Sequence, residues 1–262
     1  MSQVELYMDQ VGQGQVLLCL HGWGMHGGVF APLADSLADH FQVCRVDLPG
    51  HGYTQIIPEF NNLEILAGHV LASIRNITSD KVNILAWSMG GLIGQYLAVH
   101  NPDVINKLVL VSSTPCFENN SHWSHGLDSN VLDGFADNLS DDYRATLERF
   151  LALQFMGSIN QKNQLRRARE MLFSRPEPDV VTLQQGLGLL KQTTLLSLLD
   201  KITCPTLVVG GEHDRLVSSM AIRTLAEQVK SGQAIIFKDS GHAPFLSSAT
   251  LFSKYVTQFL HE

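Results

Sequence analysis

Short apolar runs alternate with longer stretches of helical periodicity through the first part of the chain. Each apolar run is typical of a buried strand, and apolar residues three or four positions apart are typical of an amphipathic helix. This alternation predicts a parallel sheet whose strands are joined by crossover helices. Strands are expected at 16–20, 42–47, 82–87 and 107–112, and helices at 29–39, 63–76 and 90–100.

The pattern changes in the middle of the chain and then resumes. In the middle no strand is predicted, and helices are expected at 129–138, 140–156, 160–173 and 178–190. Apolar runs typical of strands return at 205–211 and 234–237. We therefore expect a mostly parallel sheet flanked by helices, formed by residues 1–116 and 191–262. A helical lid of residues 117–190 is inserted between the two halves of that sheet and is expected to cover the site.

A serine between small residues lies where a predicted strand meets a predicted helix. Ser88 follows the run 82–87, with Ala86 two positions before it and Gly90 two positions after it. This spacing is typical of a nucleophile elbow, a turn so tight that larger flanking side chains would collide. The turn holds the hydroxyl above the N-terminus of the next helix, where the N–H of Met89 can stabilise an oxyanion.

Two loops near the C-terminus supply the partners that a serine nucleophile needs. Asp214 and His242 each follow a predicted strand, so all three side chains lie past the carboxyl ends of strands. Open α/β sheets place their sites at this edge. The order Ser88, Asp214, His242 is that of the α/β-hydrolases and predicts that fold and a Ser-His-Asp triad. Asp239 is an alternative acid, but it lies on the histidine's own loop.

Each of these residues also has a purely structural interpretation. Ser88 could belong to an ordinary tight turn, Asp214 could cap a helix, and His242 could be an ordinary loop histidine. The hypothesis of a catalytic triad therefore rests on the three residues occurring together in hydrolase order.

The loop after the first predicted strand, His21-Gly22-Trp23-Gly24, offers a second oxyanion donor. Gly22 lets the backbone approach a reacting carbonyl, and we assign the donor to the backbone N–H of Trp23. The indole of Trp23 could also cover an acyl pocket.

The same loop fits a different class of enzyme. Gly22, Gly24 and Gly27 have the spacing of a dinucleotide fingerprint, and Asp47 lies twenty residues beyond Gly27. A nicotinamide-dependent oxidoreductase is therefore an alternative. The bulky Trp23 argues against it, because the backbone of that fingerprint must approach a pyrophosphate closely.

Length and composition fit one catalytic domain with an insertion. The chain has 262 residues, 45% of them hydrophobic, and a formal net charge of −7. This acidic balance argues against a nucleic-acid partner. The first residues lack a signal pattern, and no apolar run approaches the ~18 residues of a membrane span, so we expect no membrane association.

The cysteines and histidines indicate neither disulfides nor a metal. The cysteines, Cys19, Cys44, Cys116 and Cys204, have no paired spacing. They indicate buried thiols in a reducing compartment, so we expect a cytoplasmic protein, acting as a monomer. His122 and His125 are close but have no cysteine or acidic cluster at ligand spacing, so we expect no metal and no other cofactor.

The predicted lid is more basic than the rest of the chain. Residues 140–176 contain seven basic and four acidic residues, a local charge of +3. Lys162, Arg166 and Arg169 recur at helical spacing and can share one face. A solvated helix surface would have the same pattern. The functional interpretation is a docking surface for an acidic partner, because a local patch can steer association despite an acidic net charge.

Longer stretches of the sequence carry a more specific resemblance. They lie at 21–24, 46–50, 87–91, 112–117, 139–142, 148–154 and 242–245. On these stretches the chain resembles the BioH family, the pimeloyl-acyl carrier protein methyl ester esterases of bacterial biotin synthesis, over nearly its whole length. The elbow and triad motifs occur throughout the superfamily, so the lid stretches and the Trp-containing loop carry the family assignment. Two departures, Ala86 for the usual glycine and Thr54 for a common serine, remove no catalytic group.

The resemblance implies hydrolysis of the methyl ester on pimeloyl-acyl carrier protein, giving the free carboxylate and methanol without a cofactor. It implies a substrate site lined by Trp23, Ser88, Met89, His242 and the lid residues Phe150, Leu151, Ala152, Leu153 and Gln154. It also implies that lid arginines hold the carrier protein. Arg149 lies in a matching stretch, and the further candidates are Arg144, Arg166 and Arg169.

Other functions stay open at this point. A general short-chain carboxylesterase or a carbon–carbon bond hydrolase would use the same machinery. A non-catalytic ligand receptor on this fold is a different class, and the complete triad argues against it. Dehalogenases and epoxide hydrolases of similar layout need an aspartate at the elbow, so Ser88 argues against them.

Overall fold

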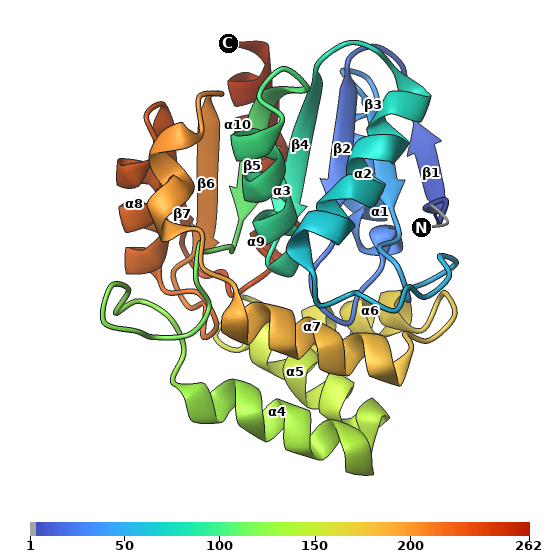
Figure 1. Ribbon diagram of the computed structural model, residues 1–262, viewed down its shortest axis with the longest axis vertical. Helices are drawn as coiled ribbons and strands as arrows, with labels where there is room; N and C mark the ends of the chain where they lie inside the picture. The colour runs from blue at the N-terminus through green and yellow to red at the C-terminus, as the bar shows by residue number, and fades with distance from the viewer. Residues whose placement is uncertain (1–3) are drawn as a thin grey trace.

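The fold is built on a seven-stranded sheet within residues 4–262, the part of the chain that the computed structural model describes (Figure 1). Residues 1–3, which belong to the segment without a signal pattern, lie outside the described residues. The strand order is β1-β3-β2-β4-β5-β6-β7, and only β1 runs antiparallel to its neighbour. The strands are β1 (Met8–Val11), β2 (Val16–Leu20), β3 (Gln42–Val46), β4 (Val82–Trp87), β5 (Ile105–Val111), β6 (Thr206–Gly211) and β7 (Gly232–Phe237).

Helices cover both faces of the sheet, which explains why three of its inner strands are buried along their whole length. Every residue of β2, β4 and β6 is buried. On one face α2 (Leu63–Ile77) packs against α3 (Met89–His100), and on the other α1 (Ala31–Leu37) packs against α10 (Ala249–His261) (Figure 1). Two short helices complete the core, α8 (Ser219–Gln228) on β6 and β7, and α9 (Pro244–Ser247) beside α10.

A layer of helices lies beneath the carboxyl ends of the strands (Figure 1). It consists of α4 (Ser129–Asp141), α5 (Tyr143–Phe155), α6 (Gln161–Leu172) and α7 (Val180–Gln192), all between β5 and β6 in the chain. The 3-10 helix η2 (Leu196–Lys201) leads from this layer back to the sheet. These helices occupy the expected positions, although α7 continues two residues past the predicted lid boundary. The division into core and lid at residues 117 and 190 stays a prediction.

The structure differs from the sequence prediction at two places in the first forty residues. Strand β1 was not predicted, because a four-residue edge strand with mixed burial has no clear alternation. The expected helix at 29–39 is two elements, the 3-10 helix η1 (Gly27–Phe30) and then α1, which has a proline in its first turn. A proline suits a helix start because the N–H it lacks would have no partner there.

All four cysteines are buried and unpaired. Burial raises the pKa of Cys44 to about 11 and raises that of Cys19 further. None of the helices within residues 4–262 has the length and apolar composition of a membrane-spanning segment.

Candidate active site

Ser88 occupies a strained turn between β4 and α3. Its φ of 55° and ψ of −119° lie in a region that L-residues rarely adopt. The N–H of Ser88 donates to the carbonyl of Val111 at 2.9 Å, and the hydroxyl of Ser113 donates to the carbonyl of Ser88 at 2.8 Å. Bonds to β5 and to the loop after it therefore hold the turn, whose geometry is typical of a nucleophile elbow.

The residues around this turn are small because neighbouring chain segments are close. A Cβ at Gly90 would lie 2.6 Å from the carbonyl oxygens of both Leu20 and His21. On the next turn of α3, a Cβ at Gly94 would lie 3.1 Å from the Cβ of Ala86. Alanine is therefore accommodated at position 86, where the motif usually has glycine, because it faces a glycine on the helix.

The structure brings Ser88, His242 and Asp214 into contact. Nε2 of His242 lies 2.9 Å from Oγ of Ser88, and Nδ1 lies 2.9 Å from Oδ2 and 3.0 Å from Oδ1 of Asp214. The side chains of His242 and Asp214 are inaccessible to solvent, and Ser88 is 4% exposed. Because a carboxylate can only accept, Nδ1 carries the proton and Nε2 is left to accept from the serine. This is the arrangement of a general base beside a nucleophile.

Asp214 holds the turn before α8 in addition to its contact with His242. Its Oδ1 also accepts hydrogen bonds from the N–H of Leu216 at 2.8 Å and of Val217 at 3.0 Å. The cap of α8 is Ser218, so Asp214 closes the turn before that helix and does not cap it. These bonds hold the carboxylate toward His242. Of the two candidate acids, Asp214 is the one that contacts the histidine.

Both candidate oxyanion donors belong to segments that adjoin the serine. A Cβ at Gly22 would lie 3.0 Å from the Cβ of Ser88, so glycine lets the loop that carries Trp23 lie against the nucleophile. Met89 begins α3. The first N–H groups of a helix have no carbonyl partner within it, so the N–H of Met89 can bind an oxyanion.

The lid contacts the site through the indole of Trp23 and through α5. The indole N–H donates to the carbonyl of Leu183 on α7 at 2.8 Å. The ring meets Phe150 of α5 edge-on, with 4.8 Å between centroids. Gln154 of α5 accepts a hydrogen bond from the N–H of His242 at 2.8 Å through its carbonyl. The two aromatic rings form an apolar wall that can adjoin an acyl chain.

The predicted substrate segment 150–154 buries only part of its surface. Phe150, Leu151 and Gln154 are buried, whereas Ala152 and Leu153 are half-buried. Leu151 lies beside a groove between α5 and α6. Two members of the segment have contacts beside Ser88, Phe150 with Trp23 and Gln154 with His242.

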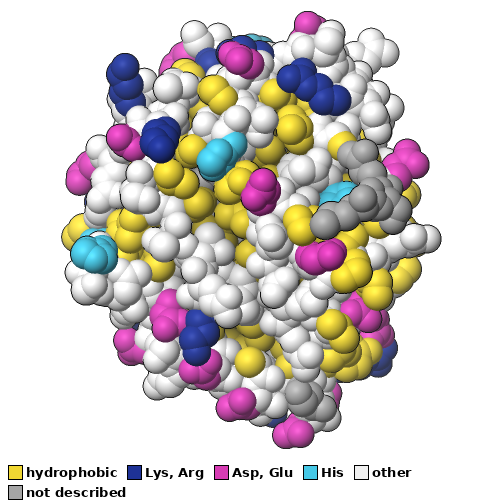
Figure 2. Space-filling model, in the orientation of Figure 1, with side chains coloured by type: hydrophobic (Ala, Val, Ile, Leu, Met, Phe, Trp, Pro, Cys, Tyr) yellow, Lys and Arg dark blue, Asp and Glu magenta, His cyan; other side chains and the backbone are white. Residues whose placement is uncertain are grey.

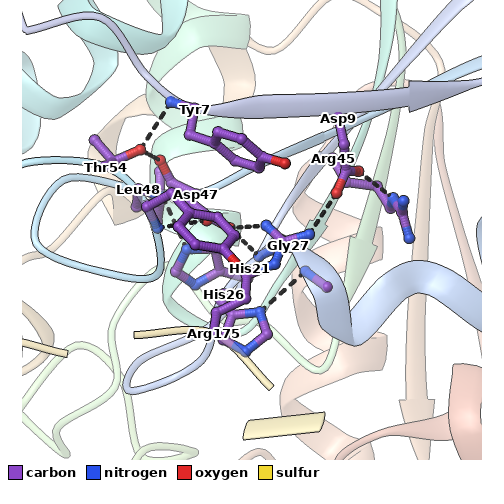
Figure 3. A network of polar contacts seen from close by, with 12 residues as sticks. Tyr7, Asp9, His21, His26, Gly27, Arg45, Asp47, Leu48, Thr54 and Arg175 are labelled. Atoms are coloured by element: carbon purple, nitrogen blue, oxygen red, sulfur yellow. Dashed lines mark hydrogen bonds and ion pairs between the residues drawn. The ribbon is translucent and has the colours of Figure 1, made fainter. Parts of the chain in front are cut away.

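The carboxylate of Asp47 is engaged inside the protein (Figure 3). It is fully buried and accepts from the N–H of Gly27 at 2.7 Å, from the N–H of Tyr53 at 2.9 Å and from Arg175. A carboxylate with these partners cannot bind the ribose of a dinucleotide. The structure therefore does not support the dinucleotide interpretation of the loop glycines. Of these, Gly22 lies against Ser88, whereas Gly24 lies against Leu147 and Gly27 against the carbonyl of Val46.

Arg175 joins the lid to the core (Figure 3). It lies between α6 and α7, its side chain is 9% exposed, and it pairs with both Asp47 and Asp9. The guanidinium also lies over the rings of Tyr7 and Tyr53, 5.2 Å and 5.6 Å from their centroids. Burial alone would lower the pKa of Arg175, but the hydrogen bonds and charges of the two carboxylates raise it overall. The sequence contains no sign of this contact, since 128 residues separate Arg175 from Asp47.

Two buried histidines beside the site act as structural groups. Nδ1 of His21 donates to the carbonyl of Gly22 at 2.8 Å, and its Nε2 accepts from the N–H of Leu48 at 2.9 Å. Nδ1 of His51 donates to the carbonyl of Pro49 at 3.0 Å. Burial lowers the pKa of His21 well below its usual value and lowers that of His51 to about 4. Both rings are therefore neutral at neutral pH.

The four candidate docking arginines are exposed on the lid, and three of them are paired with acids. The contacts are Arg144 with Glu177, Arg166 with Glu170 at 2.7 Å, Arg169 with Glu148 at 2.7 Å, and Arg149 with the Asn138 side chain at 3.4 Å. Lys162, Arg166 and Arg169 border a groove of about 300 Å³ between α5 and α6, which Leu151 and Leu165 also line.

Among residues 4–262 no group of three or more histidine, cysteine, aspartate or glutamate side chains could hold a metal ion.

Comparison with known proteins identifies the family. Residues 15–249 match the family model described as the alpha/beta hydrolase fold. A protein of Xanthomonas campestris pv. campestris (strain B100), named pimeloyl-[acyl-carrier protein] methyl ester esterase, is 38% identical over 255 residues, 97% of this chain and 98% of that protein. The chain belongs to this esterase family of α/β-hydrolases. A protein of the same name from Xylella fastidiosa (strain M12) is 37% identical over 257 residues, with the same coverage.

Solved structures agree on the fold. An esterase from Exiguobacterium antarcticum has a TM-score of 0.90 and 21% sequence identity, with 98% of this chain and 96% of that chain covered. At this identity the likeness shows the fold alone. The fold class and the family expected for this esterase from its sequence are confirmed.

Proposed function

We propose that the chain is a serine carboxylesterase that hydrolyses the methyl ester of pimeloyl-acyl carrier protein, as a step of biotin synthesis in the cytoplasm. The observation that carries the chemistry is the continuous contact from Ser88 through His242 to Asp214 at the carboxyl edge of the sheet. The printed names of the relatives support the choice of substrate. No cofactor takes part in the proposed reaction.

The reaction follows from the roles that the site allows. Ser88 attacks the ester carbonyl while Nε2 of His242 takes the hydroxyl proton, and Asp214 holds the imidazole and stabilises its charge. The backbone N–H groups of Trp23 and Met89 bind the tetrahedral oxyanion, each contributing about 3 kcal/mol. Methanol leaves with the proton from His242. Water then attacks the acyl-enzyme with His242 again as base, and the carboxylate product is released.

The lid supports this reaction by closing the site. The triad side chains are inaccessible or nearly so, with α5 and α7 in contact with the loop that carries Trp23. A site closed to bulk water strengthens the hydrogen bonds to the developing oxyanion. The aromatic wall of Trp23 and Phe150 suits the methylene chain of a pimeloyl group, and the rest of the segment 150–154 completes the proposed substrate site.

The two sides of the lid differ in charge, which indicates where an acidic carrier protein would dock. Figure 2 shows acidic side chains gathered along the lower edge of the molecule, where α4 carries Asp133, Asp137 and Asp141. The charged residues that line the groove between α5 and α6 are three basic ones, Lys162, Arg166 and Arg169, and one acidic one, Glu148. Its arginines pair with exposed acids of the lid itself, and such surface pairs contribute only about 0–1 kcal/mol. Exchange of these partners for carboxylates of a carrier protein therefore costs little.

The test compares a carrier-bound with a small substrate. We expect kcat/KM to be far higher for pimeloyl-acyl carrier protein methyl ester than for p-nitrophenyl acetate, and Ser88→Ala to abolish both activities while it still binds the carrier-bound ester. A higher value for the small ester would identify a general short-chain carboxylesterase, and retained turnover in Ser88→Ala would refute the serine mechanism. Restored growth of a biotin-requiring strain that lacks its own esterase, by the natural chain and not by Ser88→Ala, tests the same function in cells.

A further inference from the structure

The last turn of α5 and the segment that leads from it to α6, together the lid turn, are hydrogen-bonded to the loop that carries His242. The two segments lie close together, and three hydrogen bonds join them. These run from the His242 N–H to the Gln154 carbonyl at 2.8 Å, from the Gly241 N–H to the Ser158 hydroxyl at 2.8 Å, and from the Ile159 N–H to the Asp239 carbonyl at 2.9 Å.

The lid lies so close to the loops that carry His242 and Asp214 that glycine is needed on both sides of the contact. A Cβ at Gly241 would lie 2.4 Å from the carbonyl oxygen of Gln154 and 2.9 Å from Oγ of Ser158. On the lid, Gly157 has a φ of 78°, and its Cβ would lie 2.8 Å from the Cβ of His213. Ser158 is 7% exposed, so its hydroxyl is shielded from water. The turn therefore fits the histidine loop in one docked position.

The backbone of His242 is held from two directions. The core holds its carbonyl, which accepts from the indole N–H of Trp87 at 2.9 Å. The lid holds the N–H of His242 through the carbonyl of Gln154, and it holds the N–H of Gly241 through the hydroxyl of Ser158. Displacement of the turn would leave two buried N–H groups without acceptors, which is unfavourable, so the loop would rearrange.

We propose that Ser158 is a positioning residue for the esterase reaction. Through the N–H of Gly241 it fixes the backbone next to His242, so the imidazole is correctly placed for Ser88 only while the lid turn is docked. The inference rests on the proposed function, because it takes His242 to be the base that activates Ser88. A small displacement of a base from its nucleophile slows the reaction strongly.

This role links the lid surface to catalysis. Helices α5 and α6 flank the turn and carry the candidate docking arginines on their exposed sides. A partner that holds these helices against the core also holds the support of the base. Loss of the Ser158 hydroxyl is therefore expected to lower kcat rather than to raise KM, because the substrate-contacting side chains stay in place.

The experiment compares Ser158→Ala and Ser158→Thr with the natural chain. Labelling of Ser88 by a fluorophosphonate reports activation of the hydroxyl, and hydrolysis of p-nitrophenyl acetate reports kcat and KM. For Ser158→Ala we expect labelling and kcat to be about tenfold slower, with KM changed less than about twofold. Ser158→Thr retains the hydroxyl and is expected to recover most of the rate. The matched control is Ser174→Ala on the same lid, where the hydroxyl donates to the local carbonyl of Met171.

The outcomes separate this inference from the proposed function. If the natural chain is labelled and Ser158→Ala is labelled at the same rate, or if Ser174→Ala slows labelling as much, the positioning role is refuted while the serine mechanism stands. A natural chain that is neither labelled nor active overturns both. The final extent of labelling reports the folded fraction and the rate constant reports activation, so a partly unfolded Ser158→Ala still gives a decisive rate.

Discussion

The guanidinium of Arg175 and the carboxylate of Asp47 form a buried ion pair, with 2.6 Å between Nη1 and Oδ1. Asp47 follows β3, and Arg175 lies between α6 and α7, so the pair joins core and lid. Asp47 also accepts from the N–H of Gly27, on the segment that continues from the proposed oxyanion loop. One buried carboxylate therefore connects the lid to the segment that follows Trp23.

The first prediction concerns this pair. Arg175→Ala leaves Asp47 buried without its charge partner, and removal of one partner of a buried pair is strongly destabilising. We expect the free energy of unfolding to fall by about 3 kcal/mol, measured by urea denaturation. Arg167→Ala, at an exposed position of α6, is the control and is expected to change stability by less than about 0.5 kcal/mol. Equal losses in the two variants would contradict the role of the pair.

The second prediction concerns the oxyanion loop. A methyl group at Gly22 would lie 3.0 Å from the Cβ of Ser88, so Gly22→Ala must push the loop away from the nucleophile. We expect kcat to fall by about 10²-fold or more, as when one oxyanion donor is lost, with a smaller change in KM. Gly68→Ala on α2, where the added methyl meets nothing within 4 Å, is expected to keep full activity. Unchanged kcat in Gly22→Ala would exclude this loop from the oxyanion site.

The third prediction decides between the two candidate acids. Asp214→Asn can still accept from the N–H of Leu216 and Val217, so the turn is retained while the carboxylate charge is lost. We expect kcat to fall by about 10⁴-fold, because the imidazole loses the partner that holds its tautomer. Asp239→Asn is expected to have little effect, since asparagine tolerates the φ of 54° at this position. The reverse result, measured as kcat for a small ester, would transfer the role to Asp239.

The fourth prediction concerns docking of the carrier protein. Arg149→Glu reverses a charge on the exposed side of α5 without touching the triad. We expect KM for the carrier-bound ester to rise about tenfold at low ionic strength, and the effect to shrink as salt is added. KM for p-nitrophenyl acetate serves as the internal control and is expected to stay constant. A parallel rise for both esters would reject a docking role.

The fifth prediction follows from the pKa of His51, which burial lowers from 6.5 to about 4. Above pH 6.5 the imidazole is neutral in both the folded and the unfolded chain, so it adds no pH dependence to the free energy of unfolding. As the pH falls from 6.5 to about 4, the unfolded chain binds a proton that the folded chain does not, and stability falls by up to about 3 kcal/mol. Urea denaturation between pH 7.5 and 4.5 measures this slope. We expect a flatter profile for His51→Gln, and parallel profiles would contradict the assignment.

The sequence by itself determined most of the elements and the identity of the proposed triad. Hydrophobic periodicity is a local property, so the strands of the sheet and the helices of the lid layer could be predicted from short windows. The elbow could be predicted as well, because a tight turn requires small residues at fixed distances from Ser88. The positions of Asp214 and His242 followed from the rule that sites lie at the carboxyl ends of strands.

Only the tertiary structure decided how the lid is attached and what it supports. The Arg175–Asp47 pair and the bond from Gly241 to Ser158 join residues far apart in the chain, 128 and 83 positions respectively. Such contacts depend on how two layers pack, and packing leaves no periodic trace in the sequence. The same limit applies to the segment 150–154, where the rotation of the helix decided which side chains are buried. It also applies to Arg144, Arg166 and Arg169, whose acidic partners lie on neighbouring turns and segments.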